Sequence, residues 1–238
     1  MSPTLAYRAR PGALLFTLTT LLLLLGAAAP SFGHGVDEGT RDFLSQASGL
    51  LIGPFLYIGA KHMVTGYDHL LFLFGVMFLL VRSRDVLTYV TLFTLGHSTT
   101  LLLGVLAGLS LNAYLVDAVI GLSVLYKGFD NLSGFPALGL PRPEPKLMVA
   151  LFGLVHGFGL ATKLQDFELP REHLFGNLLA FNVGVEIGQL LALGVILMLL
   201  NLWRRHRSFA GAALLTNTLL MTAGVVLIGL QLGGYYFS

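Results

Sequence analysis

Long apolar segments recur along most of this 238-residue chain, and short polar stretches separate them. A helix needs about 20 mainly apolar residues to cross the hydrocarbon core of a bilayer. Because backbone groups in lipid must be satisfied within the protein, such segments favour helices. The pattern therefore predicts an all-α membrane protein, a polytopic bundle of about six transmembrane helices. The expected spans cover residues 61–81, 86–108, 113–132, 146–163, 174–202 and 211–232.

Residues 1–33 have the features of a secretory signal peptide. Arg8 and Arg10 precede an apolar stretch over residues 13–25, and small residues follow it. This order of basic, apolar and small residues is typical of a cleaved signal. We expect cleavage before His34, and an uncleaved first helix is the alternative.

Residues 34–60 are expected to form an external segment. The first half of this segment is polar and acidic, whereas residues 49–59 are apolar, few in number and interrupted by Pro54. This second half predicts a short interfacial or re-entrant helix, or the beginning of one long kinked helix that continues into the first span. A six-helix transmembrane domain over 61–238 follows, with no convincing repeat and no second domain.

Composition also favours a membrane protein. Hydrophobic residues make up 55% of the chain and charged residues 11%, with a mean hydropathy of +0.80, whereas soluble domains have about 25% charged residues. The net charge of +2 gives no reason to expect nucleic acid as a partner, and membrane lipid is the expected surrounding.

Basic residues in short loops indicate the orientation, because they accumulate on the cytoplasmic side. Here they predict a bacterial inner-membrane protein whose mature N-terminus and C-terminus are both external, in the periplasm. The inner loops would then hold Arg82, Arg84, Arg142, Lys146, Arg204, Arg205 and Arg207.

Several of the apolar segments contain ionisable side chains. Each such group costs roughly 2.5–3.5 kcal/mol at the centre of a membrane helix, so these groups usually face the bundle interior and have a function. We hypothesise that the helices bring them together in one polar centre that binds a metal ion. The candidate ligands are His62, Asp68, His69, His97, His156 and Glu186.

Three of these candidates have more than one interpretation. Asp68 could bind a metal directly, or it could accept the hydrogen bond that fixes the tautomer of a neighbouring imidazole. His97 could be a core residue bonded to another helix. Glu186 needs a partner in an apolar segment: a metal, a protonated histidine or a proton of its own.

Four further residues are candidates for a supporting role. Asn182 and Gln189 share one helical stripe with Glu186, because the three are spaced i, i+4 and i+7. Ser98 directly follows His97. If cleavage leaves His34 at the N-terminus, its α-amine and imidazole could together chelate a divalent cation.

The absence of cysteine limits the chemistry of such a centre. It excludes disulfides, thiolate ligands and a cysteine nucleophile. Imidazole and carboxylate ligands favour a borderline divalent cation, with nickel, cobalt and zinc as the candidates. The chain also lacks the HExxH pattern of zinc proteases and the GxSxG elbow of serine hydrolases.

Four motifs occur in a fixed order: GAKHMVTGYDHLLFLFGV, FTLGHSTTLLLG, FGLVHGFGLA and FNVGVEIGQLLALG. In this order, after a signal peptide, they resemble the HupE/UreJ family of bacterial membrane proteins over about residues 34–232. The resemblance implies a secondary metal permease associated with nickel or cobalt uptake, and it implies the same six candidate ligands.

A more distant similarity is to nickel/cobalt transporters, which carry an HX4DH motif and an LGHST segment. The spacing from His62 to Asp68 and His69 is HX5DH, one residue longer, so His62 would face differently from the first histidine of that motif. Residues 95–99 read LGHST.

The sequence thus favours a secondary permease for a divalent transition metal ion, either nickel or cobalt. Two alternatives remain at this stage: an intramembrane metal-dependent hydrolase, and a metal sensor or assembly factor that does not transport. The expected partners are the metal ion and membrane lipid, and the sequence does not indicate a protein partner.

Overall fold

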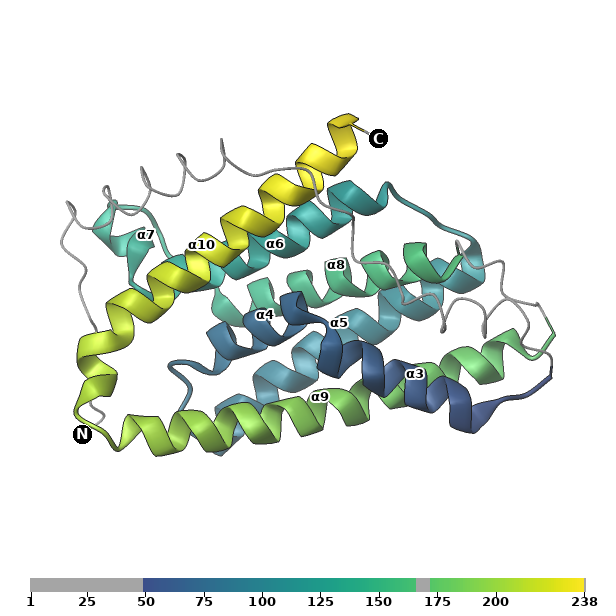
Figure 1. Ribbon diagram of the computed structural model, residues 1–238, viewed down its shortest axis with the longest axis horizontal. Helices are drawn as coiled ribbons and strands as arrows, with labels where there is room; N and C mark the ends of the chain where they lie inside the picture. Colours follow the sequence, from purple (N-terminus) through teal and green to yellow (C-terminus); the bar gives the residue numbers. More distant parts are fainter. Residues whose placement is uncertain (1–48, 166–171, 238) are drawn as a thin grey trace.

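The computed structural model describes residues 49–165 and 172–237, and every regular element in those ranges is a helix (Figure 1). The signal peptide and His34 lie outside the described residues. The helices are α3 (Ile52–Thr65), α4 (Tyr67–Met77), α5 (Ser83–Ala107), α6 (Ala113–Asn131), α7 (Gly134–Ala137), α8 (Pro145–Gln165), α9 (Leu174–Arg204) and α10 (Ser208–Phe237).

In the described part of the chain, four helices are long and apolar enough to cross a membrane: α5, α8, α9 and α10. The chain is therefore a membrane protein, but the predicted count of six is not reproduced by these criteria. Helix α6 has 19 residues and contains three charged side chains, namely Asp117, Lys127 and Asp130. Helices α3 and α4 have 14 and 11 residues, too few for either to span a bilayer alone.

The expected first span, 61–81, is not one continuous helix. Helix α3 begins earlier, at Ile52, and ends at Thr65, after which Gly66 adopts an extended conformation with φ −72° and ψ 97°. The chain then re-enters a helix at Tyr67. A Cβ at Gly66 would lie 3.0 Å from the His62 carbonyl oxygen and 3.0 Å from the Nδ1 atom of His69, so a side chain would crowd the break.

Three helix pairs form the closest contacts of the bundle: α3 with α9, α5 with α8, and α6 with α10. Glycines allow each approach, because small residues let membrane helices pack backbone to backbone. A Cβ at Gly188, Gly96 or Gly224 would lie 2.6, 2.6 or 2.5 Å from a backbone atom of the paired helix. These glycines therefore lie at the contacts that join the paired helices.

Helix α4 lies inside the bundle, between these pairs (Figure 1). The Nδ2 group of Asn131 donates to the Gly75 carbonyl at 2.8 Å and to Asn217 Oδ1 at 2.9 Å, which joins α4, α6 and α10. Arg204 Nη2 also donates to the Met77 carbonyl, at 2.5 Å, and to the Phe78 carbonyl at 3.1 Å. These bonds hold the end of α4 against the end of α9.

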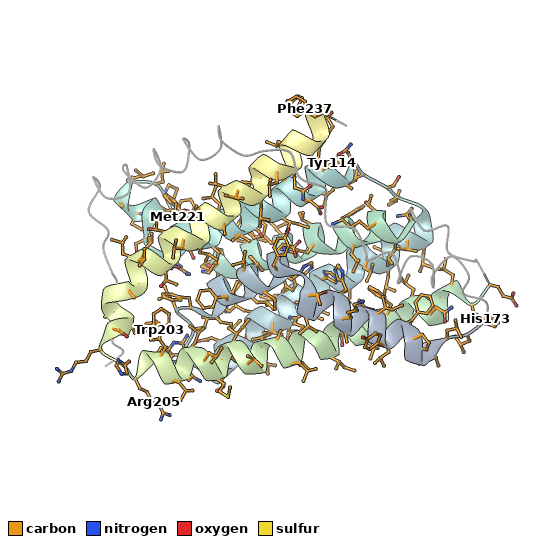
Figure 2. The ribbon with its side chains drawn as sticks, viewed as in Figure 1. Tyr114, His173, Trp203, Arg205, Met221 and Phe237 are labelled. Atoms are coloured by element: carbon orange, nitrogen blue, oxygen red, sulfur yellow. The ribbon has the colours of Figure 1, made fainter. Side chains whose placement is uncertain are left out.

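We call this side of the molecule the basic end: α4, α6 and α9 finish here, and α5, α8 and α10 begin here. Figure 2 shows Trp203 and Arg205 at this end, and His173 at the opposite one. Trp203 packs against Phe78 and Phe209 with ring centroids 6.1 and 5.0 Å apart, an aromatic cluster typical of a membrane interface. The basic loop residues of the predicted cytoplasmic side gather here.

Candidate functional site

Four histidines from three parts of the chain meet at the break between α3 and α4. The ring of His69 is at their centre, with its centroid 5.3 Å from that of His62, 4.9 Å from that of His156 and 5.9 Å from that of His97. Because Gly66 ends α3, His62 and His69 lie on different helices. They nevertheless come together through the turn at the break.

The hydrogen bonds of His69 determine which of its nitrogens can bind a ligand. Asp68 Oδ1 accepts both the backbone N–H of His69, at 2.8 Å, and its Nδ1–H, at 2.9 Å. A carboxylate at Nδ1 holds the proton there and leaves the lone pair on Nε2, the arrangement found in carboxylate–histidine–metal units. That Nε2 atom is buried and has no hydrogen-bond partner among the described protein atoms.

His156 repeats this arrangement with a backbone group. Its Nδ1 atom lies 2.7 Å from the Phe152 carbonyl oxygen, which can only accept, so Nδ1 carries the proton and Nε2 carries the lone pair. The residue is fully buried, and its Nε2 atom also has no partner in the described ranges. Two imidazoles on separate helices thus present free lone pairs to the same region.

The other two histidines contribute further unpartnered nitrogens. Both ring nitrogens of His97 are buried without a hydrogen bond to any described residue, and so is Nε2 of His62. Buried polar atoms normally have partners, so this number of orphaned nitrogens in one cluster indicates a site for a ligand. Within residues 49–165 and 172–237, however, no three His, Asp or Glu side chains stand in positions to hold a metal ion without moving.

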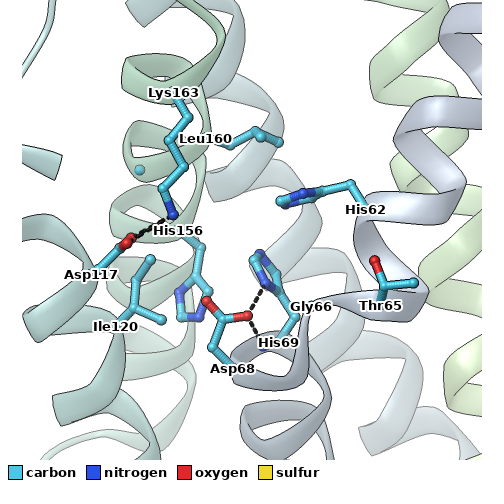
Figure 3. Close-up of a pocket in the computed structure, with 11 residues that line it drawn as sticks. His62, Thr65, Gly66, Asp68, His69, Asp117, Ile120, His156, Leu160 and Lys163 are labelled. Atoms are coloured by element: carbon cyan, nitrogen blue, oxygen red, sulfur yellow. Dashed lines mark hydrogen bonds and ion pairs between the residues drawn. The ribbon is translucent and has the colours of Figure 1, made fainter. Parts of the chain in front are cut away.

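A pocket of about 100 Å³ opens beside this cluster (Figure 3). Six ionisable or hydroxyl side chains line it from α3, α4 and α8, in addition to Asp117 of α6. At one side of the pocket Lys163 Nζ lies 3.0 Å from Asp117 Oδ1 and 2.8 Å from Oδ2. The lining residues are His62, Thr65, Gly66, Asp68, His69, Asp117, Ile120, His156, Gly159, Leu160 and Lys163.

A comparison with models of protein families shows which family this chain belongs to. A family model described as HupE / UreJ protein matches residues 38–238. The chain belongs to the HupE/UreJ family. This family is associated with nickel and cobalt transport. No curated protein and no solved structure matches the chain.

Not every residue singled out from the sequence of this HupE/UreJ protein lies at the pocket. His97 contacts His69 but does not line the cavity. Glu186 is half-buried on α9 and is likewise absent from the lining. The stripe on α9 is instead a contact with α5, where Asn182 Nδ2 donates to Ser98 Oγ at 3.0 Å and the Gln189 side-chain oxygen accepts from Thr94 at 3.1 Å.

Sequence reasoning missed two charged residues of the pocket, Asp117 and Lys163. Each looked like an ordinary charge near the end of a span, and neither belongs to the four motifs. Only the packing of α6 against α8 makes them neighbours, because they are 46 positions apart in the chain. No signal in a single sequence indicates that pairing.

A second polar cluster lies toward the basic end. Asp130 is buried and accepts from Lys127 Nζ at 2.7 Å and from Arg142 Nε at 2.6 Å. The hydrogen bonds from Arg142 to Asp130 raise the pKa of the guanidinium. The connector between α6 and α8 begins with the short helix α7 and then continues without regular structure through Arg142. Beside His156, three phenylalanines pack together. The ring centroid of Phe72 lies 5.3 Å from that of Phe93 and 5.8 Å from that of Phe152.

Proposed function

We propose that this protein is a secondary permease for a divalent transition metal ion, with nickel or cobalt as the substrate. The observation that carries the proposal is the pair of buried Nε2 atoms of His69 and His156, which have no hydrogen-bond partner among the described residues. Each imidazole is in the tautomer that a metal requires. They lie in a membrane protein of a family associated with nickel and cobalt transport.

The spacing of the imidazoles suits a shared ion. Metal–nitrogen bonds are about 2 Å long, so two imidazoles on one ion have ring centroids roughly 4.5–5.5 Å apart. The separations from His69 to His156 and to His62 are 4.9 and 5.3 Å. Imidazole with carboxylate suits nickel, cobalt and zinc, and zinc is therefore a third candidate substrate.

The incomplete convergence of these groups also suits a transporter. A permease must bind its ion and then release it, so ligands that complete their geometry only when the ion arrives are an advantage. His69 and His156 are the central ligands in this proposal, and Asp68 fixes the ring of His69 or binds the ion directly. His62, His97 and Glu186 are proposed as further ligands, which join when α3, α5 and α9 shift.

The broken helix provides a place for such a shift. Discontinuous helices form the substrate sites of many secondary transporters, where irregular backbone lines a cavity near the middle of the bilayer. Here α3 and α4 are joined only through Gly66, and three of the proposed ligands flank that joint. In our proposal, movement of α3 relative to α4 alternately opens the site to each side.

The proposed orientation follows from charge. The described loops and adjoining helix ends at the basic end contain seven Lys or Arg residues, and the positive-inside rule assigns that end to the cytoplasm. The pocket then faces the periplasm of the inner membrane, and both the mature N-terminus and the C-terminus are external. The phenylalanines beside His156 would close the path inward in this state.

Uptake of radioactive nickel and cobalt into cells that express the protein tests the proposal. His69→Ala and His156→Ala are expected to abolish accumulation above background. His173→Ala is the matched control, because that histidine is exposed in a loop. If both site variants accumulate as much metal as the parent, the proposed function is wrong. Metal binding without transport into liposomes would indicate a sensor or assembly factor instead.

A further inference from the structure

The ion pair between Lys163 and Asp117 stands inside the pocket rather than on the surface. Lys163 Nζ contacts both carboxylate oxygens, and the two side chains are only 16% and 7% exposed. Figure 3 shows the lysine extending along α8 toward Asp117 and His156. His156 and Lys163 are seven positions apart on one helix, so they share a face two turns apart.

The contact between α6 and α8 does not need this pair for packing. A Cβ at Gly159 would lie 3.1 Å from Ile120 and 3.3 Å from Val116, so the helices already meet closely through apolar atoms. Buried ion pairs contribute little net stability, because desolvation of both charges offsets their attraction. An ion pair that lines a cavity beside four histidines therefore calls for a functional explanation.

The chemistry of the two groups supplies one. The ammonium is a compact cation on a flexible four-carbon stem, and at 16% exposure it can swing toward solvent. The carboxylate is an oxygen ligand that suits a hydrated divalent cation. Lys163 and an entering ion would compete for the same carboxylate.

We propose that the Lys163 ammonium is a tethered counter-cation of the empty pocket, and that the entering divalent cation displaces it from Asp117, which becomes a ligand of the ion. This inference rests on the proposed function and adds one binding residue and one competitor to it. The exchange keeps the carboxylate neutralised at each stage, so the site never exposes an unpaired buried charge.

Nickel titration calorimetry on the purified full-length protein tests the exchange. Lys163→Met removes the competitor, and binding is expected to tighten about tenfold or more, because the ion no longer has to displace an ammonium from Asp117. Asp117→Asn is expected to weaken binding about tenfold. Lys146→Met is the matched control: it lies on the same helix at the basic end and is exposed, and its affinity should equal that of the parent.

The double variant separates displacement from simple repulsion. If the lysine acts by occupying Asp117, the gain from Lys163→Met disappears in the Asp117→Asn background, because the two effects are coupled. An equal gain in both backgrounds would overturn the proposal. Should Lys163→Met not fold, Lys163→Gln replaces it in the same cycle.

Thermal unfolding provides an independent readout. Without metal, Lys163→Met removes the ion pair to a buried carboxylate and lowers Tm, and nickel should then raise Tm by more than it does in the parent. If the parent binds nickel and the variants change only Tm and not the nickel affinity, the exchange is refuted and the permease proposal remains intact. A parent that binds none of nickel, cobalt and zinc refutes both.

Discussion

The carboxylate of Asp68 offers the most direct test of how the site holds its ion. Asp68→Asn keeps an oxygen that can accept the Nδ1–H of His69, now 2.9 Å away, but it removes the negative charge. Asp68→Ala removes both. Comparison of the two variants separates the charge of the residue from its role in orienting the ring.

The structure sets the scale of the effect. A cation on Nε2 of His69 would lie roughly 7 Å from the carboxylate oxygen, given metal–nitrogen bonds of about 2 Å and a contact of 2.9 Å at Nδ1. At an effective dielectric constant of about 20, the attraction between charges of −1 and +2 at that distance is about 5 kcal/mol, an upper value. Loss of a carboxylate behind a metal-binding histidine typically weakens metal binding about 10–100-fold.

We therefore expect Asp68→Asn to weaken nickel binding at least about tenfold in titration calorimetry. Asp68→Ala should bind nickel still more weakly than Asp68→Asn. It should also unfold more easily, because a buried donor left without a partner costs about 1–3 kcal/mol. Asp85→Asn is the matched control: that acid also lies in the first turn of a helix, but at the basic end. Equal affinity of the parent and Asp68→Asn would refute the assigned role of Asp68.

Three further predictions concern the backbone and the basic end. Gly66→Ala is expected to weaken nickel binding without loss of helix content by circular dichroism, because the new Cβ would lie 3.0 Å from the ring of His69; unchanged affinity would contradict this. Gly157→Ala should lower Tm strongly, because its Cβ would overlap a backbone oxygen of α5. Gly194→Ala is the control: its Cβ would have no atom within 4 Å, so its Tm should equal that of the parent. Equal changes of Tm in the two variants would show that the α5–α8 contact is not tight. Arg142→Met should reduce the free energy of unfolding in denaturant titration by about 1–3 kcal/mol, because it removes hydrogen bonds to a buried carboxylate. Its contribution should be constant from pH 6 to 9, because the hydrogen bonds to Asp130 raise the pKa of the guanidinium further above its usual value and the group stays charged throughout that range. A loss of stability within that range would contradict the assignment.

Much of the candidate site could be predicted from single residues. His69, His97 and His156 were recognisable because an imidazole in an apolar segment is costly anywhere in hydrocarbon. The structure places all three in one cluster with His62. Glu186 met the same criterion, yet it is half-buried on α9 and does not line the pocket. The cost of burying an ionisable side chain predicts that the residue has a partner, but it does not identify that partner.

The sequence by itself determined the class of the protein: a helical membrane bundle of the HupE/UreJ family with ionisable groups among its apolar helices. Hydropathy and the cost of burial are properties of each residue and its near neighbours, so they can be read along the chain. Only the tertiary structure decided that the chain breaks at Gly66, that four imidazoles meet there and that Lys163 faces Asp117. Those facts depend on how each helix is rotated and how closely glycines let it approach the next one, and both are set by packing between segments far apart in the sequence.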